Sequence, residues 1–178
     1  MQWGGVELII PGVSRCIRPC PGTNTGFLRY ESLERIDAPL EKCKEFVKKV
    51  GYKGLFSIEF IRGKDGKDYF MEMNFRNDGN SICVTKAGYN LPYLWYLCCI
   101  GEDYKEELSK CELRPVLVMP EFDDHGFVIR GEISFWQWFK DIVRSDAYME
   151  FDSKDMMPFF ARLRDTFERK LYKKVIKP

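Results

Sequence analysis

Two strand-like runs on either side of Asp65-Gly66 place the strongest constraint on how this chain folds. Residues 55–61 read LFSIEFI and residues 69–81 read YFMEMNFRNDGNS, and both runs alternate between apolar and polar side chains. An Asp-Gly pair between two alternating runs is typical of a tight β-hairpin. The sequence therefore predicts an antiparallel hairpin with Asp65 and Gly66 as its two turn residues.

This turn fixes which polar residues face one another across the hairpin. With two turn residues, Glu59 lies directly opposite Glu72, and Ser57 lies opposite Asn74. Side chains alternate between the two faces of a strand, so these four residues and Arg76 are expected on one face.

Two carboxylates directly opposite each other on a sheet repel and destabilise it. A cation between Glu59 and Glu72 would remove that cost. Two carboxylates and the Asn74 amide are hard oxygen donors, a set that suits Mg²⁺ or Mn²⁺, and Arg76 could hold a phosphate oxygen. The alternative interpretation is a solvated hairpin face with Arg76 as an ordinary ion-pair partner.

Composition excludes some classes of partner. The chain has 178 residues, of which 45% are hydrophobic, enough for the core of an ordinary domain. The net charge of +1 gives no reason to expect binding to nucleic acid. No apolar run is long enough to span a membrane, and the first residues lack a secretion signal.

The seven cysteines are odd in number and scattered along the sequence. This pattern argues against a disulfide framework. We interpret them as reduced, mostly buried side chains, which predicts a cytoplasmic protein.

The remaining segments predict further strands and helices. Strands are expected at 6–10 and on both sides of 123–126, the latter as a second hairpin with His125 in its turn. Residues 15–26 are expected to form a loop that carries Arg15 and Arg18.

Helices are expected at four places. The helix expected at 90–101 is apolar nearly all round and is therefore expected to be buried. The last carries a stripe of apolar residues at four-residue spacing, from Phe159 to Val175, that is expected to dock on a core. The four segments are 37–51, 90–101, 135–145, and the stretch from about 155 onward. Together the elements predict an α+β fold in which helices flank an antiparallel sheet of about five or six strands.

The hairpin and the residues after it resemble a known superfamily. The run SIEFIRGKDGKDYFMEMNFRNDGNS, followed by TKAGYNLP, is similar to the end of an ATP-grasp catalytic domain. In that superfamily a strand ending in an acidic residue precedes a hairpin whose returning strand carries Glu-x-Asn, often Glu-x-Asn-x-Arg. Biotin carboxylases, the large chain of carbamoyl phosphate synthetase and D-aspartate ligases share this pattern. The resemblance is specific over residues 51–94 and looser over 5–50.

The resemblance implies a role for each polar residue of the hairpin. Glu59 matches the first metal-binding acid, Glu72 the acid that bridges two magnesium ions, and Asn74 the amide ligand. Arg76 matches the catalytic arginine that contacts the reacting phosphate or acyl phosphate. ATP and Mg²⁺ (or Mn²⁺) are the implied cofactors.

Further residues are candidates for contacts with the nucleotide or substrate. Asn80, Ser81 and Lys86 follow the metal-binding strand, and Arg18 lies in the predicted loop near Arg15. The implied reaction joins a small-molecule carboxylate to an amine, or to a thiol, through an acyl phosphate formed with ATP.

The resemblance also implies a division of the chain. Residues 1–104 match the C-terminal subdomain of an ATP-grasp fold, and residues 105–178 are expected to add a strand hairpin and two helices packed on it. The lysines, glycine-rich flap and adenine-binding hinge of the family's N-terminal half are not found before residue 51. The expectation is therefore an enzyme half, inactive alone, with the other half missing or on another chain.

Ser57 stands where D-alanine ligases have an arginine, so that subfamily is not indicated. The alternatives are a non-catalytic interaction module derived from the same fold and an unrelated sheet domain.

Overall fold

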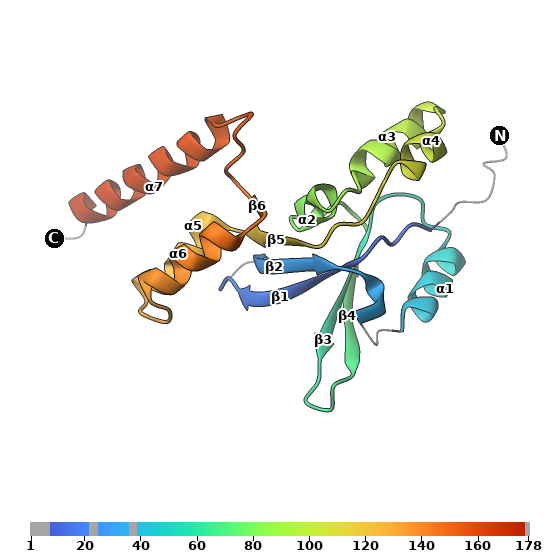
Figure 1. Ribbon diagram of the computed structural model, residues 1–178, viewed down its shortest axis with the longest axis horizontal. Helices are drawn as coiled ribbons and strands as arrows, with labels where there is room; N and C mark the ends of the chain where they lie inside the picture. Colours follow the sequence, from blue (N-terminus) through green and yellow to red (C-terminus); the bar gives the residue numbers. More distant parts are fainter. Residues whose placement is uncertain (1–7, 22–24, 36–38, 177–178) are drawn as a thin grey trace. The chain divides into compact units, whose positions relative to one another are not determined.

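The protein folds into two compact units. The computed structural model (Figure 1) describes residues 8–21, 25–35 and 39–176, with side chains up to residue 168. The first unit comprises Met1–Cys16 and Leu28–Val116, and the second comprises Ile17–Phe27 and Leu117–Pro178. The fold class is α+β, as the sequence predicts. The predicted domains, 1–104 and 105–178, differ in their bounds from these two units, and the domain assignment stays a prediction.

The strands of the described residues form two sheets rather than one sheet of five or six strands. One sheet has the order β1-β2-β5-β6, and its last two strands are parallel. Strands β3 and β4 pair only with each other, in antiparallel orientation. The prediction of a single sheet was wrong because the β3–β4 hairpin pairs with no other described strand. Strand β2 instead has β5, a strand far along the sequence, as its neighbour. The strands are β1 (Val13–Pro19), β2 (Gly26–Glu31), β3 (Ser57–Arg62), β4 (Asp68–Asn74), β5 (Val116–Met119) and β6 (Ala147–Tyr148).

The helices of the described residues include the four that the sequence predicts. The prediction of a strand at 6–10 was wrong over residues 8–10, because β1 begins only at Val13. Residues 6–7, and the first two residues of the helix predicted at 37–51, lie outside the described residues. The helices are η1 (Leu33–Arg35), α1 (Leu40–Val50), α2 (Ser81–Lys86), α3 (Leu91–Ile100), α4 (Tyr104–Ser109), α5 (Glu121–Ile129), α6 (Phe135–Arg144) and α7 (Met157–Ile176).

Helix α3 has the ends that its sequence predicts but is less buried than expected. The Asn90 side chain caps it by accepting a hydrogen bond from the Tyr93 N–H, and Gly101 ends it at a φ of 80°. Leu94 is buried, whereas Tyr93 and Tyr96 are each about half exposed. The expectation of burial was wrong for most of the helix, since Leu94 is the one residue of α3 that is buried.

Helix α5 replaces the second predicted hairpin. Residues 123–126 lie inside a helix, and His125 packs against the Trp138 ring at 5.1 Å instead of occupying a turn. Asp123 and Asp124 lie in the first turn, where carboxylates interact favourably with the helix dipole. Asp124 is also held by a distant ion pair that no local pattern reveals.

That ion pair joins Arg18 to two carboxylates in the core of the second unit. The Arg18 guanidinium binds Asp124 through two nitrogens, at 2.8 and 2.6 Å, and binds Asp141 at 3.1 Å. Asp124 is fully buried and Asp141 is 1% exposed. The rings of Phe27 and Phe127 lie 5.4 and 5.6 Å from the guanidinium carbon. Arg18 therefore belongs to strand β1 and to a buried charge network, not to the predicted loop.

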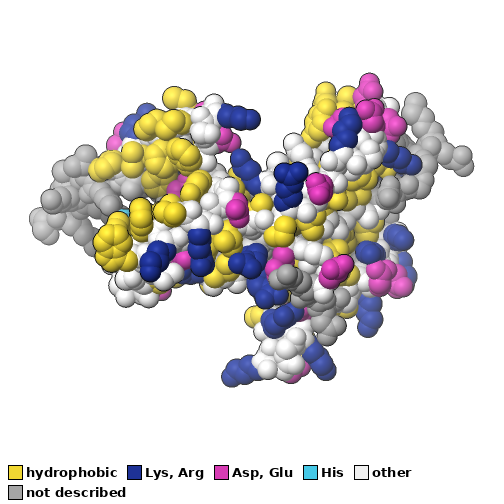
Figure 2. Space-filling model, in the orientation of Figure 1, with side chains coloured by type: hydrophobic (Ala, Val, Ile, Leu, Met, Phe, Trp, Pro, Cys, Tyr) yellow, Lys and Arg dark blue, Asp and Glu magenta, His cyan; other side chains and the backbone are white. Residues whose placement is uncertain are grey.

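The second unit exposes several large apolar side chains. Trp136 of α6 is 69% exposed, and hydrophobic side chains gather over the region of α6 and the start of α7 (Figure 2). The stripe predicted on the last helix is only partly buried, at Phe159 and Leu163, and Phe159 contacts Phe122 and Phe151. Phe167 is largely exposed, and the side chains of Leu171 and Val175 lie outside the described residues.

The seven cysteines are free thiols, as predicted. The expectation that most of them are buried was wrong, because only Cys20, Cys43 and Cys83 are buried and Cys16 and Cys99 are exposed. In the described ranges no helix combines the length and apolar character needed to cross a membrane.

The Arg18 network yields a prediction about stability. Replacing Arg18 with Met leaves the fully buried Asp124 without its cation, whereas Asp141 keeps Arg144 at 3.2 Å. The free energy of unfolding should therefore fall by about 3–5 kcal/mol. Chemical denaturation measures this change. Arg164→Met, which removes an exposed arginine with two ion pairs on α7, should cost less than about 1 kcal/mol. Equal losses for the two variants would contradict the assignment.

Glu150 makes the second unit sensitive to pH. Its Oε2 atom is buried without a hydrogen-bond partner among the described side chains and backbone. Burial, followed by the negative charges of Glu121 and Asp123, raises the pKa of Glu150 to about 7. A carboxyl whose folded-state pKa is raised favours folding while it is protonated, and that contribution is lost as the pH rises through about 7.

The free energy of unfolding should therefore fall as the pH rises from about 5 to about 8. Glu150→Gln, which imitates the protonated carboxyl, should flatten this dependence and raise the free energy of unfolding at pH 8 by about 1–2 kcal/mol. Glu168→Gln changes an exposed carboxyl and should leave the dependence as it is. A Glu150→Gln profile that matches the wild-type profile would refute this prediction.

Candidate functional site

The β3–β4 hairpin turns differently from the prediction yet reaches the predicted pairing. The Gly63 N–H donates to the Lys67 carbonyl at 2.8 Å, so the tip is one residue longer than the predicted two-residue turn. Gly66 lies in this tip with a φ of 81°, a conformation that favours glycine. Without a compensating change, the longer tip would shift the pairing of every residue beyond it.

A β-bulge supplies that compensation. Glu59 pairs with Glu72, but the next residue, Phe60, pairs with Phe70, so Met71 is an extra residue on β4. Beyond the bulge the pairing is the predicted one, and Ser57 lies opposite Asn74. The pairing of the two glutamates is therefore confirmed, although the prediction of the turn was wrong.

The two carboxylates and the amide meet on one face of the hairpin. The Asn74 Nδ2 atom lies 2.8 Å from Glu72 Oε1 and 3.4 Å from Glu59 Oε1. One amide group therefore donates to both acids. The structure thus brings together the three residues that the sequence nominates as metal ligands.

The negative charge of this cluster is only partly compensated. Burial raises the pKa of Glu59, and the negative charge of Glu72 raises it further. The Asp78 charge adds to the rise in the Glu59 pKa, while Arg76 partly offsets it. Sequence analysis missed Asp78, although it stands two residues after Arg76 in the same polar run.

The residues after β4 form the start of helix α2. Asp78 accepts a hydrogen bond from the Asn80 N–H at 3.0 Å, and its backbone carbonyl accepts one from the Ser81 N–H. Asn80 is the N-cap of α2, and Lys86 lies in its last turn. The Arg76 side chain is exposed and donates to the Asn77 carbonyl at 3.3 Å. These four predicted residues lie in the first unit, as the hairpin does.

Arg18 and Arg15 have acidic partners of their own. Asp124 and Asp141 bind the Arg18 guanidinium within the second unit, and Arg15 lies 3.3 Å from the buried Glu31. Arg144 also pairs with Asp141, at 3.2 Å, so two arginines balance the two carboxylates. A phosphate would therefore have to compete with both for that guanidinium.

The donor set of the hairpin fits a hard divalent cation. The described ranges contain no group of three or more His, Cys, Asp or Glu side chains arranged to hold a metal ion. A cation here would thus use two carboxylates, the amide oxygen, and oxygens from water or phosphate, as Mg²⁺ commonly does. The Ser57 Oγ atom, opposite Asn74, is buried and has no hydrogen-bond partner among the described residues.

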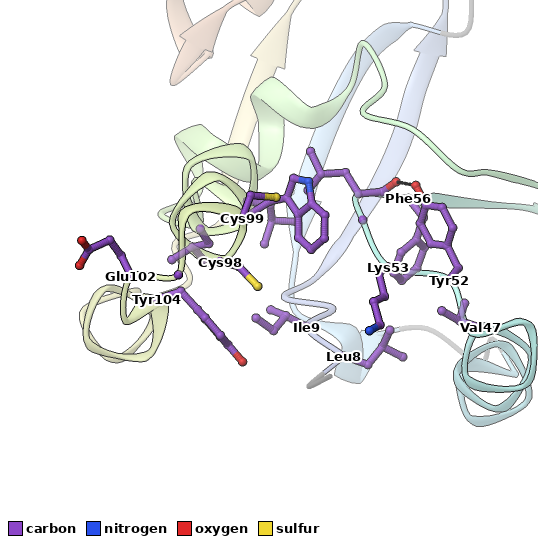
Figure 3. A pocket seen from close by; sticks show the side chains of 16 residues that line it. Leu8, Ile9, Val47, Tyr52, Lys53, Phe56, Cys98, Cys99, Glu102 and Tyr104 are labelled. Carbon is purple, nitrogen blue, oxygen red and sulfur yellow. Dashed lines mark hydrogen bonds between the residues drawn. The ribbon is translucent and has the colours of Figure 1, made fainter. Parts of the chain in front are cut away.

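A separate apolar pocket lies in the first unit (Figure 3). Its volume is about 610 Å³, and α1, α3 and the segment before β3 contribute to its walls. Trp95 and Cys98 line it, as does Tyr52, whose hydroxyl lies 2.9 Å from the Leu55 carbonyl. The same hydroxyl lies 3.0 Å from the Phe75 carbonyl, and the two rings pack at 4.6 Å. Tyr52 therefore links the residues just before β3 to the residue that follows β4.

Comparisons with known proteins leave the family open. No protein-family model matches the chain, and no curated protein or solved structure is significantly similar to it. The geometry of the hairpin is therefore the basis for proposing a function.

The repulsion between the two glutamates gives a testable expectation. The folded state raises the pKa of Glu59, so the ionised carboxylate is less favourable in the folded than in the unfolded state. The free energy of unfolding therefore falls as the pH rises from the ordinary glutamate pKa through the raised one. Glu59→Gln should therefore raise the free energy of unfolding near pH 7, without divalent cations, by about 0.5–1 kcal/mol.

The matched control is Glu106→Gln, which changes an exposed carboxyl of α4 and should not stabilise the protein. Denaturation at a pH below the ordinary glutamate pKa should shrink the difference between Glu59→Gln and wild type, because the raised pKa of Glu59 makes its protonated form prevail there. A destabilising effect of Glu59→Gln at pH 7 would contradict the repulsion.

Proposed function

We propose that this chain carries the magnesium-binding half of an ATP-dependent ligase that joins a carboxylate to an amine or thiol. The observation that carries the proposal is the pairing of Glu59 with Glu72 across the hairpin, with the Asn74 amide between them. The resemblance of the hairpin sequence to ATP-grasp enzymes supports the same chemistry. On this proposal the fold is the C-terminal half of an ATP-grasp domain.

In the proposed reaction, the γ-phosphoryl group of ATP passes to a substrate carboxylate, which yields an acyl phosphate and ADP. The amine or thiol then attacks the acyl carbon, and phosphate leaves. Bound magnesium supplies positive charge that neutralises the triphosphate. Glu59, Glu72 and Asn74 would hold it, because their oxygens are the ligands it prefers.

The exposed Arg76 guanidinium follows the metal-binding strand and suits a phosphate oxygen, which it can bind through two nitrogens. Asn80, Ser81 and Lys86 continue along the chain into α2 and would contact the acyl phosphate or the substrate. Arg18 is left out of the proposed site because its charge is balanced by buried carboxylates.

The proposal assigns the adenine and the remaining phosphate contacts to another segment or another chain. The present residues alone should then bind magnesium and nucleotide weakly and turn over no substrate. Binding rather than turnover is therefore the appropriate first test.

Calorimetric titration with Mg²⁺ and ATP should detect weak binding to the wild-type chain. Glu72→Ala should lower the affinity by about tenfold or more, since it removes a direct ligand. Glu41→Ala, an exposed glutamate on α1, serves as the matched control and should bind as the wild type does. Equal affinities of wild type and Glu72→Ala would contradict the proposed function.

A non-catalytic module derived from the same fold is the alternative. Glu72→Gln in the complete protein distinguishes the two, because a ligase should lose activity while an interaction module should keep its function.

A further inference from the structure

Ser57 occupies a distinctive place beside the carboxylate cluster. It begins strand β3, lies directly opposite Asn74, and is two residues before Glu59, on the same face. Its Oγ atom is buried and has no hydrogen-bond partner in the described part of the chain. A buried hydroxyl without a partner is less favourable than one that is hydrogen-bonded. Native structures rarely leave such groups unpaired, so the hydroxyl calls for a partner in another state of the site.

The Asn74 amide is the nearest polar group with a reason to change its orientation. Its Nδ2 atom now donates to Glu72 at 2.8 Å and to Glu59 at 3.4 Å. An amide NH₂ group is a donor only, so it cannot bind a cation, whereas the amide oxygen can. If Asn74 is to bind a cation held by the two glutamates, its side chain must turn so that Oδ1 takes the place of Nδ2.

After that turn the NH₂ group has lost both carboxylate acceptors. Directly opposed residues on antiparallel strands have Cβ atoms about 4.5–5.5 Å apart, which places the Ser57 hydroxyl within reach of the Asn74 side chain. A serine hydroxyl accepts as well as donates hydrogen bonds. The unpaired hydroxyl and the displaced NH₂ group therefore complement each other.

We infer that Ser57 is a positioning residue for the cation site. Its hydroxyl accepts a hydrogen bond from Asn74 Nδ2 when the Asn74 oxygen turns towards a divalent cation. Ser57 itself touches neither the cation nor a substrate. The inference rests on the proposed function, because it requires Glu59, Glu72 and Asn74 to bind a cation.

Manganese binding to the full chain tests this role. Mn²⁺ replaces Mg²⁺ at hard oxygen sites, and free Mn²⁺ is measured directly by electron paramagnetic resonance. Ser57→Ala should weaken Mn²⁺ binding by about tenfold, the effect expected for an outer-shell partner. Ser57→Thr keeps the hydroxyl and suits a strand position, so its affinity should remain close to that of the wild type.

Two further measurements separate positioning from a structural role. Without metal, Ser57→Ala should unfold with an unchanged or higher free energy, because it removes an unpaired buried hydroxyl. In nuclear magnetic resonance spectra, the Asn74 side-chain NH₂ signals should shift on addition of Mg²⁺ in the wild type. That shift should differ in Ser57→Ala and be retained in Ser57→Thr.

Each outcome decides the inference. Unchanged Mn²⁺ affinity in Ser57→Ala, together with its loss in Glu72→Ala, would overturn the role of Ser57 and leave the proposed function standing. Failure of the wild type to bind Mn²⁺ more tightly than Glu72→Ala would overturn both. A loss of metal-free stability in Ser57→Ala, without rescue by Ser57→Thr, would mark the hydroxyl as structural and overturn the inference.

Discussion

The repulsion between Glu59 and Glu72 is the constraint on which the rest of the site depends. The two carboxylates are directly paired on a two-stranded sheet, and the neutral Asn74 amide donates a hydrogen bond to both. Holding them there requires a hairpin with a defined register, which the bulge in β4 maintains. It also requires fixed strand ends, where the Tyr52 hydroxyl meets the Phe75 carbonyl. These features cost stability unless a positive charge joins the cluster.

The second unit shows how the same chain compensates paired carboxylates with its own arginines. Asp124 and Asp141 are almost completely buried, and Arg18 binds both of them directly. Their negative charge is balanced within the protein, so the network serves to hold the fold together. No described Lys or Arg side chain has an ion pair with Glu59 or Glu72 in the structure, and Arg76 acts on Glu59 only as a neighbouring charge. This contrast favours an external cation in the hairpin.

Sequence reasoning reached the pairing of Glu59 with Glu72 from the Asp65-Gly66 turn, and the pairing holds because the longer tip and the bulge offset each other. It did not foresee the longer tip or the extra Met71. The effects of these two changes on the register cancel beyond the bulge. It missed helix α5 because the local pattern of strand-like runs outweighed the helix-favouring acids at its start. It placed Arg18 in a loop because its partners lie more than a hundred residues away. Local patterns thus predicted the pairing within the hairpin better than the long-range contacts elsewhere in the chain.

The central claim is that a divalent cation binds between Glu59 and Glu72. The most direct measurement is the titration of the Glu59 carboxyl carbon by nuclear magnetic resonance, with and without Mg²⁺. Without Mg²⁺ the pKa of Glu59 should lie above the ordinary glutamate value. Because a bound cation favours the ionised form, Mg²⁺ should lower this pKa markedly, and Glu72→Ala should abolish most of the effect. A Glu59 pKa that is the same with and without Mg²⁺ would contradict the account.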